Sequence, residues 1–108
     1  MRAEPEFEGV TLAVDAKRIG MPVLASVPGR FLRRHPSRPD VFVRPGQRVA
    51  AGSMLGLVAV GPVLVPVIMP EDGFVLSVVS PDGRAVGYGE ALAEILTLSE
   101  LAKMGITA

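Results

Sequence analysis

The feature that most constrains the fold is an internal repeat spaced by glycines. Residues 46–58 resemble residues 83–95 at a constant offset of 37. The matching pairs are Gly46 with Gly83, Val49 with Val86, Gly52 with Gly89, Leu55 with Leu92 and Val58 with Ile95. Because glycine adopts positive φ without a steric penalty, each copy predicts two tight turns followed by a strand. The duplication predicts two β-halves related by a pseudo-twofold axis.

The repeat extends upstream with a change of spacing. Pro28-Gly29-Arg30-Phe31 resembles Asp72-Gly73-Phe74-Val75 at an offset of 44, so the first half carries seven additional residues. These fall within residues 34–40, Arg-His-Pro-Ser-Arg-Pro-Asp, a composition typical of a loop. We therefore expect a protruding loop on one half only.

Composition favours an all-β domain. The 108 residues include twelve glycines and ten prolines, which interrupt Val-rich runs too often for long helices. We expect strands at Met21–Ser26, Gly29–Arg33, Val41–Val43, Arg48–Val49, Met54–Val60, Val63–Met69, Gly73–Val79, Ala85–Val86 and Ala91–Leu98.

The expected division of the chain has three parts. Residues 1–20 form an extension with an added edge strand at Glu8–Val14, which could pair with a second copy and make a homodimer. Residues 21–98 form the domain. Residues 99–108 form a tail or short helix, with helix from Leu98 to Met104, Ser99 as its N-cap and Gly105 just past its end.

Charge and residue types exclude several functions. The formal net charge is zero and aromatic residues are few, which argues against nucleic-acid binding. There is no cysteine and His35 is the only histidine, so we expect no metal site and no catalytic residues. No apolar run is long enough to span a membrane and no secretory signal is present, so we expect a cytoplasmic location.

Three segments resemble the biotinyl/lipoyl carrier domain, a flattened barrel-sandwich hybrid. Residues 45–55 resemble the family pattern G-[QD]-x-V-x-x-G-[DQ]-x-[LI], residues 72–75 resemble G-x-[IV], and residues 83–92 resemble G-x-x-V-x-x-G-x-x-L. The loop also resembles the "thumb" region, F-Y-R-x-P-S-P, of the biotin carboxyl carrier subunit of acetyl-CoA carboxylase. We call residues 34–40 the thumb.

The sequence departs from this family at one decisive place. The family pattern E-A-M-K-M aligns with residues 59–63, which read Ala-Val-Gly-Pro-Val, so Pro62 stands where the family carries its modified lysine. Biotin and lipoate are both attached through an amide to a lysine amine, and proline has no such amine. The only lysines are Lys17 and Lys103, outside the matched segments. The resemblance therefore implies a carrier fold without a bound cofactor.

Two groups of residues are candidates for an interaction surface. The first is the basic group around the thumb. The second is the apolar hairpin, whose outward half we expect to form an exposed patch of Val60, Val63 and Val65. A solvated charged face and an ordinary core strand remain the alternatives for these two groups. The residues that we assign to interaction are Arg33, Arg34, His35, Arg38, Val60, Gly61, Pro62 and Val63.

The function implied is that of a non-biotinylated carrier-like protein that binds or regulates an acetyl-CoA or related acyl-CoA carboxylase complex. It would not be an enzyme, and its partners would be carboxylase subunits or the true carrier. One alternative is a working carrier modified at Lys17 or Lys103. The other is a structural barrel-sandwich interaction module, because one fold can host unrelated functions.

Overall fold

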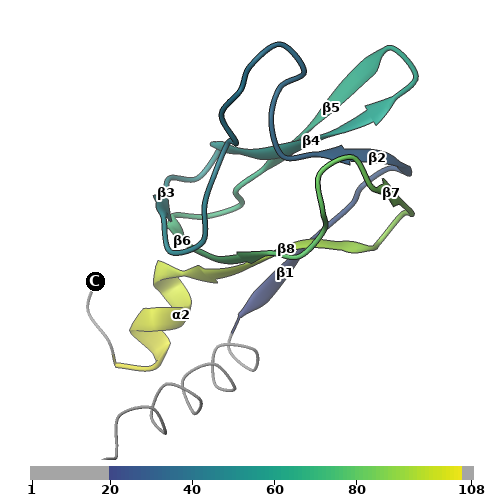
Figure 1. Cartoon of the computed structure of the whole chain (residues 1–108). Coiled ribbons are helices and arrows are strands. Elements are labelled where there is room, and N and C mark those ends of the chain that lie inside the picture. The colour runs from purple at the N-terminus through teal and green to yellow at the C-terminus, as the bar shows by residue number, and fades with distance from the viewer. Residues whose placement is uncertain (1–19, 106–108) are drawn as a thin grey trace, which may run out of the picture.

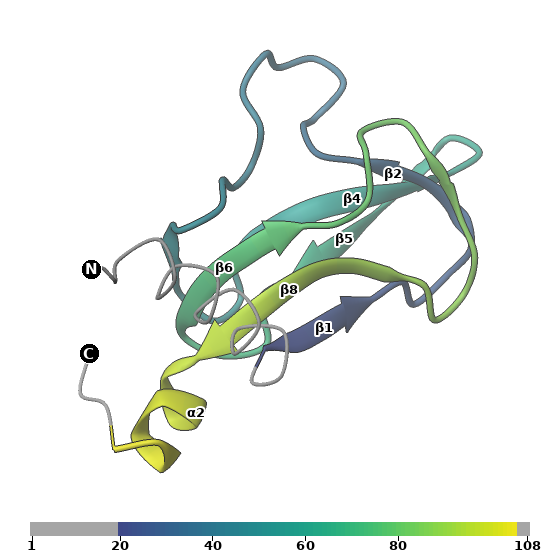
Figure 2. The ribbon, with the colours of Figure 1, turned by 60° about the horizontal axis from the view of Figure 1, so that its bottom comes forward.

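The computed structural model describes residues 20–105, which form two four-stranded antiparallel sheets and one short helix (Figure 1). The strands are β1 (Met21–Leu24), β2 (Gly29–Leu32), β3 (Arg48–Val49), β4 (Met54–Val60), β5 (Val63–Ile68), β6 (Gly73–Val78), β7 (Ala85–Val86) and β8 (Ala91–Thr97), followed by helix α2 (Leu98–Lys103). Their orders are β1-β8-β6-β3 and β5-β4-β2-β7. The two sheets face each other as a flattened sandwich, so the expectation of an all-β barrel-sandwich fold is confirmed (Figure 2).

The two sheets are related by the duplication seen in the sequence. Exchanging β1 with β5, β2 with β6, β3 with β7 and β4 with β8 converts one strand order into the other. Backbone hydrogen bonds repeat in the same way: Gly46 N donates to Val75 O over 2.6 Å, and its counterpart Gly83 N donates to Phe31 O over 2.7 Å. Likewise Gly52 N donates to Met69 O and Gly89 N to Ala25 O, both over 2.8 Å. The predicted pseudo-twofold is therefore present in the backbone.

The repeated glycines serve two different purposes. The four turn glycines all have positive φ, between 81° and 87°, as expected: Gly46, Gly52, Gly83 and Gly89. Gly29 and Gly73 instead allow close packing. A Cβ on Gly29 would lie 2.5 Å from the carbonyl oxygen of Ala59, and one on Gly73 would meet the equivalent oxygen of Leu96. These two glycines set how closely the strands approach in each half.

The core lies between the inner faces of the two sheets. Its side chains come from both halves and include the repeat positions Val49, Leu55, Val58, Val86, Leu92 and Ile95, together with Phe31 and Val75. Alternate residues of a strand point to opposite faces. A register shift at Leu55 in β4, repeated at Leu92 in β8, lets both of these leucines face inward together with Val58 and Ile95.

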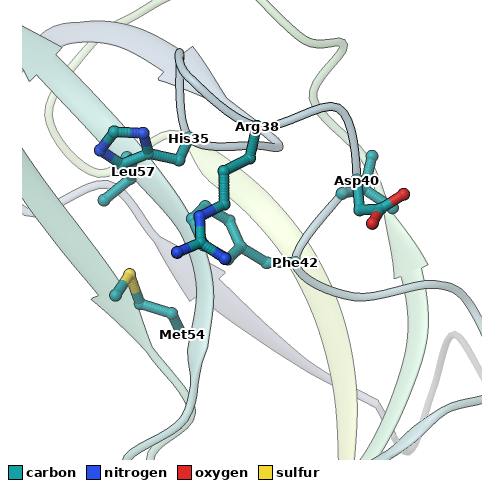
Figure 3. A pocket seen from close by; sticks show the side chains of 7 residues that line it. His35, Arg38, Asp40, Phe42, Met54 and Leu57 are labelled. Carbon is teal, nitrogen blue, oxygen red and sulfur yellow. The ribbon is translucent and has the colours of Figure 1, made fainter.

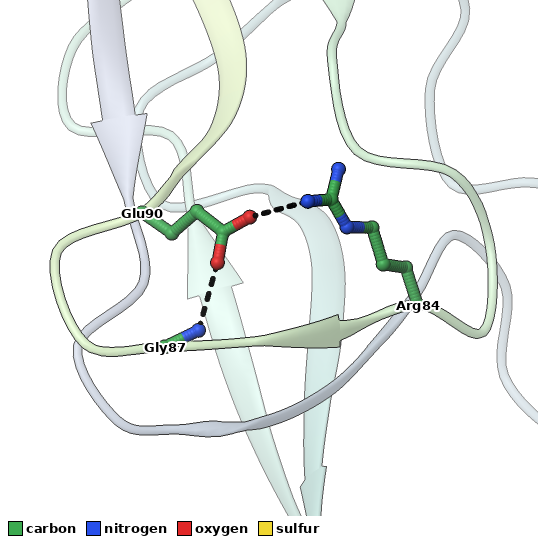
Figure 4. A network of polar contacts seen from close by, with 3 residues as sticks. All are labelled: Arg84, Gly87 and Glu90. Atoms are coloured by element: carbon green, nitrogen blue, oxygen red, sulfur yellow. Dashed lines mark hydrogen bonds and ion pairs between the residues drawn. The ribbon is translucent and has the colours of Figure 1, made fainter.

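The turn between β7 and β8 shows how such a loop is fixed (Figure 4). Glu90 Oε1 accepts a hydrogen bond from Gly87 N over 2.9 Å, and Glu90 Oε2 pairs with Arg84 Nη2 at 3.2 Å. Arg84 is exposed and Glu90 is half-buried, so solvent screens the ion pair and it contributes little, and the bond to the backbone holds the turn.

The structure corrects two of the expectations, and a third concerns residues that it does not describe. Val41–Val43 is not a strand. Phe42 N donates to Arg33 O over 2.8 Å, but no strand ladder extends from that bond. Val43 is instead held in place by its burial in the core. The N-cap of α2 is Thr97, whose hydroxyl accepts from Glu100 N, and not Ser99. The helix itself is present, with Gly105 at φ 81° just beyond it. The edge strand expected at Glu8–Val14 lies outside the described residues.

Within residues 20–105, no helix is long and apolar enough to cross a membrane.

Candidate functional site: the hairpin and the thumb

Strands β4 and β5 form a projecting hairpin with a tight apolar tip. Val60 pairs with Val63, which leaves Gly61 and Pro62 as a two-residue turn. Gly61 has φ 57°, and the proline ring holds its own φ near about −65°, a combination that fits a type II′ turn. The tip is therefore an ordinary tight hairpin, and neither turn residue has a side-chain amine or any other side-chain polar group.

The faces of the hairpin differ from our expectation for its outward patch. Val58 pairs with Val65 and lies in the core, so alternation places Val60 and Val63 on the same, inward face. Val60 is nevertheless 41% exposed and Val63 57% exposed, because the tip extends past the core. Val65 is half-buried, so the three valines do not form one outward patch.

The outward face of the hairpin consists of apolar residues. Its cross-strand pairs are Met54 with Ile68, Leu57 with Pro66, and Ala59 with Leu64. Pro66 is tolerated here because a two-residue hairpin alternates bonded and non-bonded pairs from its tip, which turns the nitrogen of Pro66 away from β4. The proline thus removes no ladder hydrogen bond.

The thumb is fixed by hydrogen bonds of its own. Arg34 Nη1 donates to Pro39 O over 2.7 Å, and Arg38 N donates to His35 O over 2.9 Å. His35 Nδ1 accepts from Ser37 N at 3.1 Å and lies 2.8 Å from Ser37 Oγ. At its base, Arg33 N donates to Asp82 Oδ1 over 2.6 Å. Arg33 and Arg34 therefore help to shape the loop, and the Ser37–His35 contact is part of a local turn.

A pocket of about 430 Å³ separates the thumb from β4. It is lined by His35, Arg38, Asp40, Val41, Phe42, Met54 and Leu57. Figure 3 shows His35 and Arg38 projecting from the thumb toward Leu57 and Met54, whereas the Asp40 carboxylate turns away from Arg38. The pocket therefore has an apolar floor supplied by the strand and a basic rim supplied by the thumb.

The structure brings together only part of the predicted interaction set. His35 and Arg38 share the pocket, whereas Val60 to Val63 lie at the hairpin tip and do not line it. The lining residues that sequence reasoning missed are Asp40, Val41 and Phe42 after the thumb's arginines and, on β4, Met54 and Leu57. The last two form the floor. Met54 and Leu57 both lie on the outward face of β4. They are three residues apart because of a bulge between Met54 and Gly56, so an alternating pattern does not reveal that they share a face.

The chemistry of this site suits binding. Within residues 20–105, no group of three or more His, Cys, Asp or Glu side chains is placed to hold a metal ion. The pocket lining combines an apolar floor with one imidazole, one guanidinium and Asp40, whose carboxylate turns away from Arg38. Such a surface can bury an apolar side chain and hold an acidic group beside it.

The comparisons with known proteins agree with this architecture. No curated protein matches the sequence of the chain. Among solved structures, the chain resembles part of a single-chain, multi-domain long-chain acyl-CoA carboxylase, with a TM-score of 0.61 and 18% sequence identity. The likeness covers 73% of this chain and 7% of that carboxylase, so it concerns the fold. A profile of the biotin/lipoyl family, described as biotin-requiring enzyme, matches residues 22–95. Because this match spans most of the chain, the protein belongs to the biotin/lipoyl family, whose domains are carriers without catalytic activity of their own.

Proposed function

We propose that this protein is a carrier-like subunit that carries no biotin and docks on a biotin-dependent acyl-CoA carboxylase as a regulator or scaffold. It would occupy the place where a true carrier docks, without delivering carboxybiotin. The family membership and the likeness to a carrier-sized part of an acyl-CoA carboxylase support the class of partner.

The observation that carries the proposal is the tip of the β4–β5 hairpin. Gly61 and Pro62 form the turn that aligns with the family's lysine position. The unbroken pairing of Gly56–Val60 with Val63–Val67 on either side of the turn supports this alignment. Lys103, the lysine within the described residues, lies in the last turn of α2. Figure 1 and Figure 2 both place α2 at the opposite end of the domain from the hairpin tip.

Intact mass of the protein isolated from its own cells tests the absence of the modification. We expect the mass of the unmodified chain. A mass increase of one biotinyl or lipoyl group, mapped to Lys17 or Lys103, would instead establish a working carrier with an unusual attachment site.

Binding to purified biotin carboxylase and carboxyltransferase subunits of the same organism tests the docking. We expect one of them to bind the wild-type chain, and Val63→Asp to weaken binding by about tenfold or more, because an exposed apolar tip is replaced by a charge. Lys103→Gln, at the other end of the domain, is the matched control and should bind like the wild type. Failure of both subunits to bind the wild-type chain would leave a structural interaction module as the remaining alternative.

A further inference from the structure

The pocket beneath the thumb holds an arginine without an acidic partner among the described residues. Arg38 projects over the apolar floor, and its guanidinium has no carboxylate within ion-pair distance in residues 20–105. Asp40, which also lines the pocket, turns its carboxylate away (Figure 3). A guanidinium beside an apolar surface binds a carboxylate well, because each N–H donor then gains a charged acceptor. The pocket therefore selects an acidic group that is joined to an apolar one.

The charge of the surrounding loop strengthens this selection. Residues 30–44 contain five arginines and a single carboxylate, that of Asp40. The five are Arg30, Arg33, Arg34, Arg38 and Arg44. The chain as a whole is neutral, so an equal excess of acidic residues lies elsewhere in it.

A segment of the same chain has the complementary composition. Residues 4–8 read Glu-Pro-Glu-Phe-Glu, with three carboxylates around one phenylalanine. They belong to residues 1–19, which precede the described part of the chain. Glu8 is separated from Gly20 by twelve peptide steps, which span up to about 40 Å when extended. This reach exceeds the two shorter extents of the molecule, 26 and 25 Å, and covers most of the long one, 52 Å. The segment is therefore long enough to reach the thumb of its own molecule.

We propose that residues 4–8 dock in the thumb pocket of their own chain, with Phe7 on the floor formed by Met54 and Leu57 and a glutamate on Arg38. The segment would then act as an internal competitor for any partner of the thumb. Because only the described pocket and the charge pattern carry this inference, it is independent of whether a carboxylase is the partner.

The chain of 108 residues offers a direct test because it contains no cysteine and has five methionines. A nitroxide on Ala3→Cys, in protein enriched with ¹³C in its methionine methyl groups, probes which methionine lies near the segment. Met54 lines the pocket, Met104 caps α2 at the far end of the domain, and Met69 is a core residue that reports on folding. We expect the Met54 signal to lose most of its intensity and the Met104 signal to keep it.

Substitutions then test the chemistry of the contact. Replacing Glu4, Glu6 and Glu8 by Gln should restore the Met54 signal, as should Arg38→Gln. The matched controls are Asp15→Asn, an acid outside the docking stretch, and Arg48→Gln, an arginine that stacks on Phe74 away from the pocket. Both controls should leave the broadening unchanged, with Met69 shifts unaltered in every variant.

Two results would overturn the proposal. The first is an unbroadened Met54 signal in the spin-labelled chain. The second is broadening of Met54 in a mixture of spin-labelled unenriched chains and enriched unlabelled chains, which would show that a second copy supplies the segment. Added salt should weaken a contact made within the chain, because exposed charges are screened.

Discussion

The β4–β5 hairpin and the β8–β1 pair are equivalent by the internal twofold, yet they end in opposite ways. Val58–Val65 in the first pair corresponds to Ile95–Met21 in the second. Beyond this point β4 and β5 continue to a tip with two exposed valines, whereas β8 runs into helix α2, which buries Leu101. One scaffold therefore produces one end that projects into solvent and one end that is covered.

The loops that follow the equivalent strands β2 and β6 also differ between the two halves, in their length. The connection that contains the thumb runs from residue 33 to residue 47, and its counterpart runs only from residue 79 to residue 84. The thumb and the projecting tip both belong to the sheet β5-β4-β2-β7 or follow directly from it. The duplication thus maintains the fold in both halves, while the features suited to binding are concentrated on one side.

The largest effect should come from breaking the packing that both halves share. Gly29→Ala and Gly73→Ala each place a Cβ against a backbone carbonyl, which cannot move without shifting a strand. We expect each to lower the free energy of unfolding by about 3 kcal/mol, measured by urea denaturation. Gly87→Ala, where a Cβ would meet nothing within 4 Å, is the control and should be close to neutral. A Gly29 variant as stable as the Gly87 variant would show that the two halves are not packed alike.

Removing the apolar contact of α2 would uncover the closed end. Leu101 is 8% exposed, so Leu101→Ala should cost about 2 kcal/mol of unfolding free energy through lost burial and a partial cavity. Lys103→Ala on the same helix is exposed and should change little. If both variants were equally stable, α2 would not be part of the cooperative unit.

A smaller effect should separate the two hydroxyls at the start of α2. Thr97→Val keeps the shape of a buried side chain but loses the cap to Glu100 N, which should cost about 1 kcal/mol in thermal or urea unfolding. Ser99→Ala removes an exposed hydrogen bond to Glu71 and a 3.2 Å contact with Thr97 Oγ1 but leaves the cap itself in place, so it should cost a few tenths of that. The reverse order would mean that Ser99 is the functional cap.

The smallest effect on stability should come from the projecting end. Val60→Ser and Val63→Ser alter side chains that are already exposed past the core, so we expect changes within about 0.5 kcal/mol. Circular dichroism melts of the single and double variants would measure this. A loss as large as that of Leu101→Ala would show that the tip is packed against something in the free chain.

The sequence was sufficient to predict the pseudo-twofold because its glycines are required by the backbone geometry. The turn glycines need positive φ and the packing glycines need the absence of a Cβ, so their spacing records the backbone path directly. The length of the thumb followed from the same spacing. These are local requirements that a single residue type can satisfy.

Other features depend on tertiary contacts that no local pattern records. Thr97 and Ser99 both carry hydroxyls suited to capping. Thr97 is the N-cap because β8 ends at Thr97 and the helix begins at the next residue, Leu98. The apolar run Val41–Val43 suggested a strand, but the structure assigns no strand to these residues. The pocket required the thumb to lie over β4, which only the folded chain determines.

The position of Pro66 has a consequence for the behaviour of the protein at high concentration. An apolar strand at the edge of a sheet is a template for strands of other molecules, and repeated addition of this kind leads to fibres. In β5 one of the nitrogens that would face such an incoming strand belongs to Pro66 and cannot donate, which interrupts the row of donors after Leu64. The chain can therefore present an apolar hairpin to a partner while remaining a poor seed for its own polymerisation.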